Sequence, residues 1–399
     1  MTSTARFASS LSTLADSEAA FRAAVDALRA GLAGARPDVV FAFVSHHHGT
    51  AIESLGPALA RETDARIVLG CTGESIVGAE REVERGPALS LFAGVMPDTQ
   101  LTPFDVHAVR DEQGAFAFSH VPEVQDAKRA GLILLADPFS FPMSDYLEVL
   151  GAVLPGVPAI GGMASGGHGP GQNLLFDARG VVEGGALGLV VEGAVEVRTV
   201  VSQGCRPIGR PWVITACKDN VVHRLGGKTA IEALVETFGK LSPRDRELLQ
   251  SQPFVGLALD ATKSRFERGD FLVRGIIGAD NERGALAIGD DTLRTGMTVQ
   301  FLVRDAESAG EDLAQLLRQR AGGVPAAPDE VGALVFTCNG RGTRMFPAPN
   351  HDVGCLRAAL ENTVPAAGFF ALGEIGPVGG RNFLHGFTAS VALFRARVG

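Results

Sequence analysis

The polar residues with the greatest chemical variety stand in one glycine-rich stretch, GEIGPVGGRNFLHG (373–386). Glu374, Arg381, Asn382 and His385 supply a carboxylate, a guanidinium, an amide and an imidazole within twelve residues. The guanidinium or a backbone N–H can hold a carboxylate, and Glu374 can hold an ammonium. The stretch therefore predicts a binding site for a zwitterion such as an amino acid. The alternative is a structural network in which these side chains bond to one another.

Two further turns, CTGES (71–75) and CNGRG (338–342), each end an apolar run. From these turns the candidate ligand site gains Cys71, Thr72, Glu74, Cys338, Asn339 and Arg341. A thiol at a strand end can act as a nucleophile, with His351 or His385 as the base. The alternative is that both thiols are small buried hydrophobic groups. We leave catalysis open, with binding as the stronger hypothesis, and assign no catalytic residue.

The stretch SHHHG (45–49) is a metal candidate, because His46 and His48 point to one side of an extended chain. No H-E-x-x-H motif or cysteine stands nearby, so we predict a solvated turn and no metal ion.

Two nucleotide-binding motifs are present only in incomplete form. GGKTAIE has Val222 where a phosphate-binding loop needs glycine, and CNGRG is followed by Met345 where a dinucleotide fingerprint needs one. The sequence therefore predicts no cofactor.

The surrounding pattern mixes strands, helices and hairpins. An amphipathic helix is expected over residues 16–32, and apolar runs at 38–45, 66–70, 88–95 and 131–137 predict strands. Thr50 with Glu53, and Thr229 with Glu232, have the capping-box spacing that marks a helix start. A hairpin is expected at 212–225, so the sheets should be mixed and not purely parallel.

An internal repeat accounts for the length of the chain. VPAIGGMASGGHGP (157–170) and VPAAGFFALGEIGP (364–377) are identical at eight of fourteen positions, and each follows an apolar strand, a Phe-Pro pair and a helix. Glycines kept in both copies while the side chains between them change indicate a backbone requirement. We expect two duplicated lobes of mixed α/β structure, with helices covering the sheets and a ligand pocket between the lobes.

Composition narrows the function classes. The 399 residues exceed the roughly 250–300 at which a single core stops growing, and 46% are hydrophobic. The net charge of −9, with no cluster of Lys and Arg, argues against nucleic acid as a partner. No signal peptide or long apolar run is present, so we expect a cytoplasmic protein with no membrane partner. Five cysteines without a C-x-x-C pair are expected to be reduced thiols.

The chain resembles the FIST family (F-box and intracellular signal transduction proteins), with both its N-terminal and its C-terminal domain. The resemblance extends from about residue 37 to about residue 395 and rests on the order of VLGCTGESIVG, GCRPIGRPWVIT, LGGKTAIEAL, CNGRG, PNHDV and GFFALGEIGPVGGRNFLHGFTASVALF. It implies a sensory domain that binds small ligands such as amino acids. The chain looks like the stand-alone form of the family, which would signal through a separate protein or simply bind its ligand. It supplies no catalytic residues.

The resemblance and the residues together predict an N-terminal helix in 1–36, a FIST N-like domain in 37–202 and a FIST C-like domain in 203–395. The expected function is binding of a small polar metabolite in signal transduction. A cysteine-dependent acyl-transfer or hydrolytic enzyme and a protein-interaction scaffold stay as alternatives.

Overall fold

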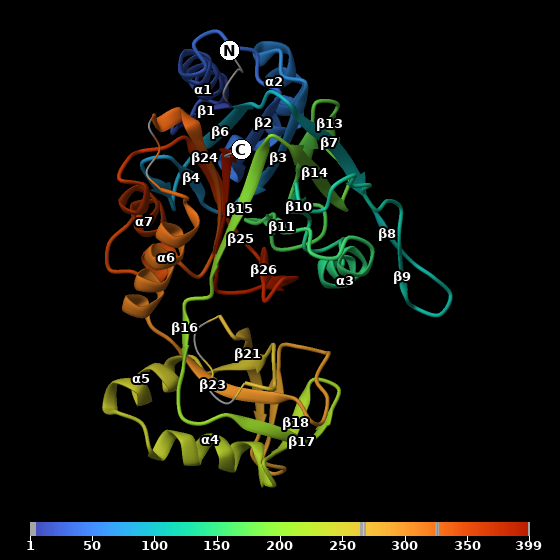
Figure 1. Cartoon of the computed structure of the whole chain (residues 1–399), viewed down its shortest axis with the longest axis vertical. Helices are drawn as coiled ribbons and strands as arrows, with labels where there is room; N and C mark the ends of the chain where they lie inside the picture. The colour runs from blue at the N-terminus through green and yellow to red at the C-terminus, as the bar shows by residue number, and fades with distance from the viewer. Residues whose placement is uncertain (1–4, 264–265, 267–268, 324, 326, 398–399) are drawn as a thin grey trace. The chain divides into compact units, whose positions relative to one another are not determined.

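The computed structural model describes residues 5–263, 266, 269–323, 325 and 327–397. The chain divides into two compact units (Figure 1). The flanking unit comprises Met1–Val201 and Leu313–Gly399, and the central unit comprises Ser202–Asp312. Each unit has its own sheets and its own apolar core.

The flanking unit contains three six-stranded sheets. The first has, in spatial order, β1 (Arg6–Ser12), β6 (Leu89–Val95), β2 (Val39–Ser45), β3 (Ile67–Gly73), β12 (Leu175–Asp177) and β13 (Gly180–Val182). The second has β7 (Thr99–Val106), β14 (Ala186–Gly193), β10 (Ala130–Ala136), β11 (Ala159–Met163), β26 (Glu374–Val378) and β27 (Arg381–His385). The third has β15 (Val195–Ser202), β28 (Ala389–Ala396), β24 (Val331–Cys338), β25 (Ala366–Ala371), β4 (Ile76–Gly78) and β5 (Glu82–Val83).

The three sheets share one arrangement, and the parallel pair of each sheet defines a copy: the first is built on β2 and β3, the second on β10 and β11, and the third on β24 and β25. Each has a central parallel pair joined by a helix, through α2 (Leu55–Thr63) in the first sheet, α3 (Met143–Val153) in the second and α7 (His351–Leu360) in the third. The first strand of each pair also has an antiparallel neighbour. The hairpin beside the second strand comes from another copy in every sheet. The three copies are therefore interlocked through their hairpins.

The repeated glycines are explained by the parallel pairs. Gly161 lies opposite Leu134, and Gly368 lies opposite Val335. A Cβ at either glycine would lie 1.8 Å from the carbonyl oxygen of its opposite residue, too close for any other amino acid. Gly70 has the same register in the first copy. The sequence prediction of a backbone requirement at these positions is confirmed.

The sheets pack through their inner faces and are covered on their outer faces. Phe43 from the first sheet lies against Phe336 and Phe369 from the third, with ring centroids 5.3–6.2 Å apart. Ile133 and Leu187 of the second sheet belong to the same apolar core. Outside, α1 (Ser17–Gly31) and α2 cover the first sheet, α3 covers the second, and α6 (Ala306–Arg320) and α7 cover the third.

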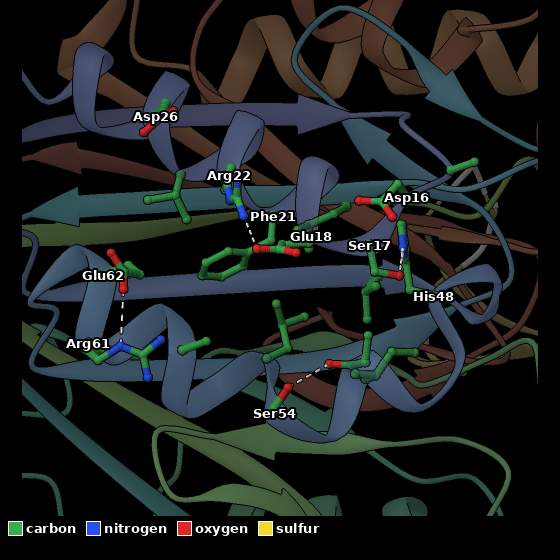
Figure 2. A pocket seen from close by; sticks show the side chains of 18 of the residues that line it. Asp16, Ser17, Glu18, Phe21, Arg22, Asp26, His48, Ser54, Arg61 and Glu62 are labelled. Carbon is green, nitrogen blue, oxygen red and sulfur yellow. Dashed lines mark hydrogen bonds and ion pairs between the residues drawn. The ribbon is translucent and has the colours of Figure 1, made fainter.

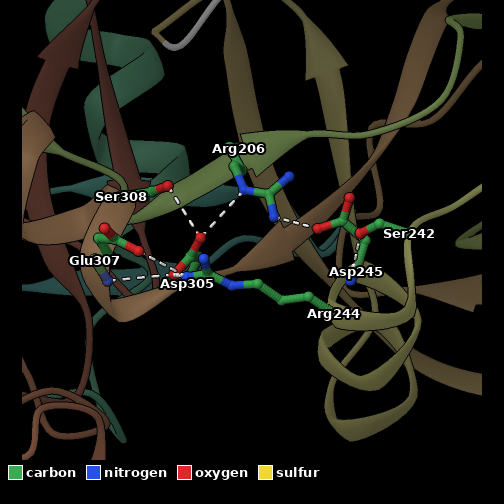
Figure 3. A network of polar contacts seen from close by, with 7 residues as sticks. All are labelled: Arg206, Ser242, Arg244, Asp245, Asp305, Glu307 and Ser308. Carbon is green, nitrogen blue, oxygen red and sulfur yellow. Dashed lines mark hydrogen bonds and ion pairs between the residues drawn. The ribbon is translucent and has the colours of Figure 1, made fainter.

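The central unit is a closed ring of six antiparallel strands. The strands are, around the ring, β17 (Trp212–Lys218), β18 (Val221–Leu225), β22 (Ala285–Ile288), β21 (Phe271–Asp280), β20 (Phe254–Ala258) and β23 (Thr298–Arg304). The remaining elements are β16 (Cys205–Pro207), β19 (Lys228–Thr229), α4 (Ala230–Gly239) and α5 (Pro243–Ser251). Arg206 of β16 bridges Asp245 of α5 and Asp305 after β23, which ties the helix to the ring (Figure 3).

The mixed α+β fold predicted from the sequence is confirmed. Both sequence repeats lie in the flanking unit. The duplication in the sequence therefore does not correspond to the division of the chain into two units. The first copy, built on β2 and β3, is an additional copy that the repeat in the sequence does not reveal. The capping box at Thr229 and Glu232 is present. The helix expected at Thr50 is instead a 3₁₀ segment, η1 (His46–Ser54), with no side-chain cap, and α2 begins only at Leu55.

Two short hairpin strands, β8 (Ala108–Arg110) and β9 (Phe116–Phe118), lie between β7 and β10. The short 3₁₀ segments η2 (Pro328–Glu330) and η3 (Gly342–Arg344) flank β24. Among the helices that the structure describes, none is long and apolar enough to cross a membrane.

Candidate functional site

A groove of about 850 Å³ lies between α1 and the η1–α2 segment (Figure 2). Both helices are amphipathic and press apolar residues onto the first sheet, Leu28 from α1 and Leu59 from α2. Between them Val44, near the end of β2, and Leu89, the first residue of β6, line the groove. The groove is lined by Ala15, Asp16, Ser17, Glu18, Phe21, Arg22, Val25, Asp26, Arg29, Val44, His48, Ala51, Ile52, Ser54, Leu55, Ala58, Arg61, Glu62 and Leu89.

The rim of the groove carries charges of both signs. On α1, Arg22 forms an ion pair with Glu18. On the α2 side, Glu62 pairs with Arg61 at 3.1 Å and with Arg29 of α1 at 3.5 Å. The floor is apolar, with the ring of Phe21 lying between the two helices (Figure 2). The groove thus offers an apolar surface below and hydrogen-bonding charged groups above.

One end of the groove holds a serine–histidine pair. The Oγ atom of Ser17, the first residue of α1, lies 3.0 Å from Nδ1 of His48 in η1 (Figure 2). His48 is only 7% exposed. Burial lowers its pKa, and the neighbouring His47 adds to this, whereas the charge of Asp16 opposes it. These effects together favour the neutral form of the imidazole.

The corresponding place in the second copy is filled by aromatic rings. There, the segment between β7 and β10 stands where α1 stands in chain order, and α3 stands where α2 does. Phe118 from that segment packs against Phe141 and Tyr146, with ring centroids 4.9–5.7 Å apart. The first copy has no such cluster among its groove-lining residues, of which Phe21 is the one aromatic ring besides His48.

The residues predicted from CNGRG lie at the carboxyl end of β24, beside the start of α7. Arg341 is fully buried, and its Nε and Nη2 donate to the two carboxylate oxygens of Asp352 at 2.8 and 2.7 Å. Burial alone would raise the pKa of Asp352, but Arg341 holds it well below its usual range. Cys338 accepts a hydrogen bond from the Gly340 N–H at 3.3 Å. The carbonyl of Asn339 accepts one from Arg344 at 2.8 Å.

A buried carboxyl group that the sequence did not single out completes this cluster. Oε1 of Glu82 accepts hydrogen bonds from the backbone N–H groups of Asp352 and Val353, at 2.8 and 3.0 Å, and so caps α7. Burial raises the pKa of Glu82 to about 8, and the charge of Asp352 adds to the effect. Glu82 sits in the β4–β5 hairpin of another copy, so only the folded structure brings it here.

Glu74 and Glu84 hold the following loop. Glu74 forms an ion pair with Arg344. Both carboxylate oxygens of Glu84 accept from the Thr343 N–H at 2.9 Å. Of the predicted residues, the structure thus brings together Cys338, Asn339, Arg341 and Glu74.

The residues of 373–386 form a separate group on β26 and β27. Glu374 is buried and accepts from the Thr388 hydroxyl at 2.8 Å. The Asn382 amide bonds to the backbone of Val157 and Ala159, both at 2.9 Å. This side chain therefore joins β27 to the start of β11 in the second copy.

His385 is buried and bonds to the carbonyl of Gly376 at 2.9 Å, and exposed Arg381 lies over the ring of Phe383. Within the bonds described for them, Glu374 and Asn382 bond to Thr388 and to backbone, not to each other. None of the four predicted residues of 373–386 lines the groove, and a ligand at this hairpin stays a prediction.

Cys71 and Thr72 lie inside β3. Burial raises the pKa of the Cys71 thiol well above its ordinary value, and the side chain belongs to the core between the sheets. The Thr72 hydroxyl accepts from the Leu174 N–H at 3.0 Å. Both side chains are fully buried, so they act in packing and strand pairing.

The three histidines of 46–48 bond in different directions. His46 bonds to the Ser165 carbonyl at 3.0 Å, His47 to Ser45 at 3.3 Å, and His48 to Ser17. Across the part of the chain that the structure describes, no group of three or more His, Cys, Asp or Glu side chains is placed to hold a metal ion.

Sequence reasoning missed the groove. The sequence pattern indicates His48 only as a metal ligand, and the helix at 16–32 only through its apolar stripe. Ser17 and His48 are 31 positions apart and meet because α1 and η1 pack on the same sheet face. One feature of the sequence does point to the groove. The helix at 16–32 and the segment after residue 45 stand on either side, in the sequence, of one buried strand at 38–45.

Comparison with known proteins decides the family. The FIST N domain matches residues 38–228, and the FIST C domain matches residues 230–377. The chain belongs to the FIST family. FIST domains are linked to signal transduction. The boundary between the two matched domains falls inside the central unit, and α1 precedes the matched residues.

Relatives of the protein cover nearly its whole length. An uncharacterized protein of Mycobacterium tuberculosis is 39% identical over 376 residues, which are 94% of this chain and 96% of the relative. An uncharacterized protein of Mycobacterium bovis is 37% identical over 379 residues, covering 94% of this chain and 95% of the relative. These matches extend the similarity beyond the two domains.

Proposed function

We propose that this FIST protein is a sensor that binds a small polar metabolite, such as an amino acid, in the groove between α1 and α2. The carrying observation is the groove of about 850 Å³ in the first copy, at a place where the second copy has packed aromatic rings. Filling such a space with side chains would stabilise the fold. A space kept open in one copy of a repeated architecture favours a role in binding.

The lining of the groove supports this assignment. Small-molecule sites in proteins usually occupy roughly 300–1,000 Å³ and combine an apolar surface with a few polar groups. Here Phe21, Val25 and Ile52 provide the apolar surface. Charged groups of both signs on the rim suit a ligand that carries both an anionic and a cationic group.

We further propose that the ligand-bound form is recognised in the cytoplasm by a separate signalling protein. The groove is bounded by two surface helices, so a ligand that draws them together would change the exposed face they present. The exposed face of α1 and α2 is therefore the surface that the signalling protein would contact when a ligand is bound.

A thermal-shift screen with the twenty amino acids and small carboxylates tests the proposal. A ligand at about 100 times its Kd adds roughly 2.7 kcal/mol to the free energy of unfolding. Ala58→Trp, which fills the groove from α2, should remove the shift. Ala27→Trp, on exposed α1 surface that does not line the groove, should retain it. A folded protein that no compound stabilises, or shifts that survive Ala58→Trp, would overturn the proposal.

A further inference from the structure

At one end of the groove, the hydroxyl of Ser17 and the imidazole of His48 are polar groups that can select one class of ligand. We propose that the hydroxyl of Ser17 contacts a carboxylate group of the ligand, with His48 positioned behind it as a proton-linked partner. The inference rests on the proposed binding function of the groove and specifies which end of it receives the anion.

The first support is the position of Ser17 at the start of a fifteen-residue helix. Asp16 caps α1, accepting from the Ala19 N–H at 2.8 Å. The first turn of a helix favours negative charge, because its backbone N–H groups point outward along the axis. Ser17 is partly exposed and lines the groove, so its hydroxyl is within reach of a ligand.

The second support is the state of His48. In the described structure its Nδ1 bonds to Ser17, while its Nε2 is buried without a hydrogen-bond partner. An Nδ1–H that donates to Ser17 Oγ leaves the serine proton free to donate to the ligand. A carboxylate that accepts from the Ser17 hydroxyl favours this arrangement. Its negative charge also favours a second proton on the imidazole, at Nε2, which makes His48 cationic.

The charged groups around His48 are consistent with a switchable site. Burial lowers the pKa of the His48 imidazole, His47 in η1 lowers it further, and Asp16, the N-cap of α1, opposes both effects. The other charged groups that line the groove stand on the two helices, with Glu18, Arg22, Asp26 and Arg29 on α1 and Arg61 and Glu62 on α2. Glu18 and Arg22 form an ion pair, as do Arg61 and Glu62. A bound carboxylate beside Ser17 would therefore add a new charge next to His48.

The experiment compares acids with their uncharged amides. Binding of L-leucine, L-glutamate, butyrate and 4-methylpentanoate, and of leucinamide and butyramide, is measured by calorimetry with the whole protein. L-leucine and butyrate should bind the wild type at least about tenfold more tightly than leucinamide and butyramide, as expected for a hydrogen bond to a charged group. Ser17→Ala should remove this preference, and Ser17→Thr, which keeps a hydroxyl, should restore it.

Two further variants complete the design. Ser144→Ala, which removes an exposed hydroxyl in the first turn of α3, outside the groove, serves as the matched control and should leave the acid preference unchanged. His48→Gln tests the positioning role. In the wild type, acids should bind more tightly at about pH 6 than at about pH 8, with uptake of a proton, and His48→Gln should abolish this pH dependence.

The possible failures are distinguishable. If the amides bind as tightly as the acids, or if Ser17→Ala keeps the acid preference, the inference is wrong, while loss of binding in Ala58→Trp would still uphold the groove as the site. If none of the acids binds the wild type, the inference is overturned as well. The proposed function then depends on the wider screen alone.

Discussion

At the scale of single residues, the buried polar groups of the flanking unit serve structure in most places. Asp352 neutralises Arg341, and Thr388 bonds to Glu374. Breaking a buried ion pair such as Arg341–Asp352 by removing one partner costs about 3–5 kcal/mol, because the other charge is left without compensation. These contacts hold the CNGRG turn and the β26–β27 hairpin in their folded conformation.

Glu82 gives the first prediction. Its pKa is near 4.5 in an unfolded chain and about 8 in the folded protein, so the folded state keeps a proton that the unfolded state releases. Its contribution to stability is complete below about pH 4.5 and is lost as the pH rises through 8. Glu82→Gln should flatten the pH dependence of the unfolding free energy over this window. Urea unfolding at several pH values measures it.

The control for this prediction is Glu80→Gln, an exposed residue beside the same hairpin. It should leave the pH profile of the wild type in place. Equal profiles for wild type and Glu82→Gln would show that Glu82 titrates as an ordinary carboxyl group.

The second prediction concerns the thiols. Burial raises the pKa of Cys71 well above its ordinary value and that of Cys355 to about 11. Neither should form a thiolate at neutral pH, so iodoacetamide should modify both far more slowly in the folded protein than in urea. Mass spectrometry of the digested protein reads each site. Rapid labelling of folded Cys71 would revive the alternative of a cysteine-dependent enzyme.

At the scale of elements, the agreement between sequence and structure depends on where the deciding contact lies. The helix at 16–32 was predictable, because its cap and apolar stripe are local, and it forms as α1 with Asp16 as N-cap. The start of α2 was not, because η1 is shaped by bonds of its histidines to Ser165 and Ser17, which are distant in sequence. The Glu82 cap of α7 has the same origin.

The third prediction belongs to α1. Asp16→Ala removes the N-cap and should destabilise the protein by about 1 kcal/mol, within a range of roughly 0.5–2. Because α1 forms one wall of the groove, the same change should weaken the affinity of any ligand found in the screen. Thermal unfolding and calorimetry measure the two effects. Asp16→Asn, which keeps a capping side chain, should stay close to the wild type, and equal losses for both variants would show that capping is not the cause.

At the scale of the whole molecule, the main features are three interlocked copies and a separate central unit. Two copies could be found in the sequence, because Gly161 and Gly368 are both forced by a carbonyl oxygen across the parallel pair. The first copy, built on β2 and β3, has Gly70 in register but little else of the repeat, so its strands read as ordinary apolar runs. The groove could not be predicted, because it depends on how completely side chains fill the space between two helices.

The central claim is that the groove of the first copy binds a small ligand. The most direct measurement is a calorimetric titration of the best stabiliser from the screen into the wild type, Ala58→Trp and Ala27→Trp. We predict saturable binding to the wild type and to Ala27→Trp, and loss of at least about a hundredfold in affinity for Ala58→Trp. Unchanged affinity of a folded Ala58→Trp variant would contradict the account.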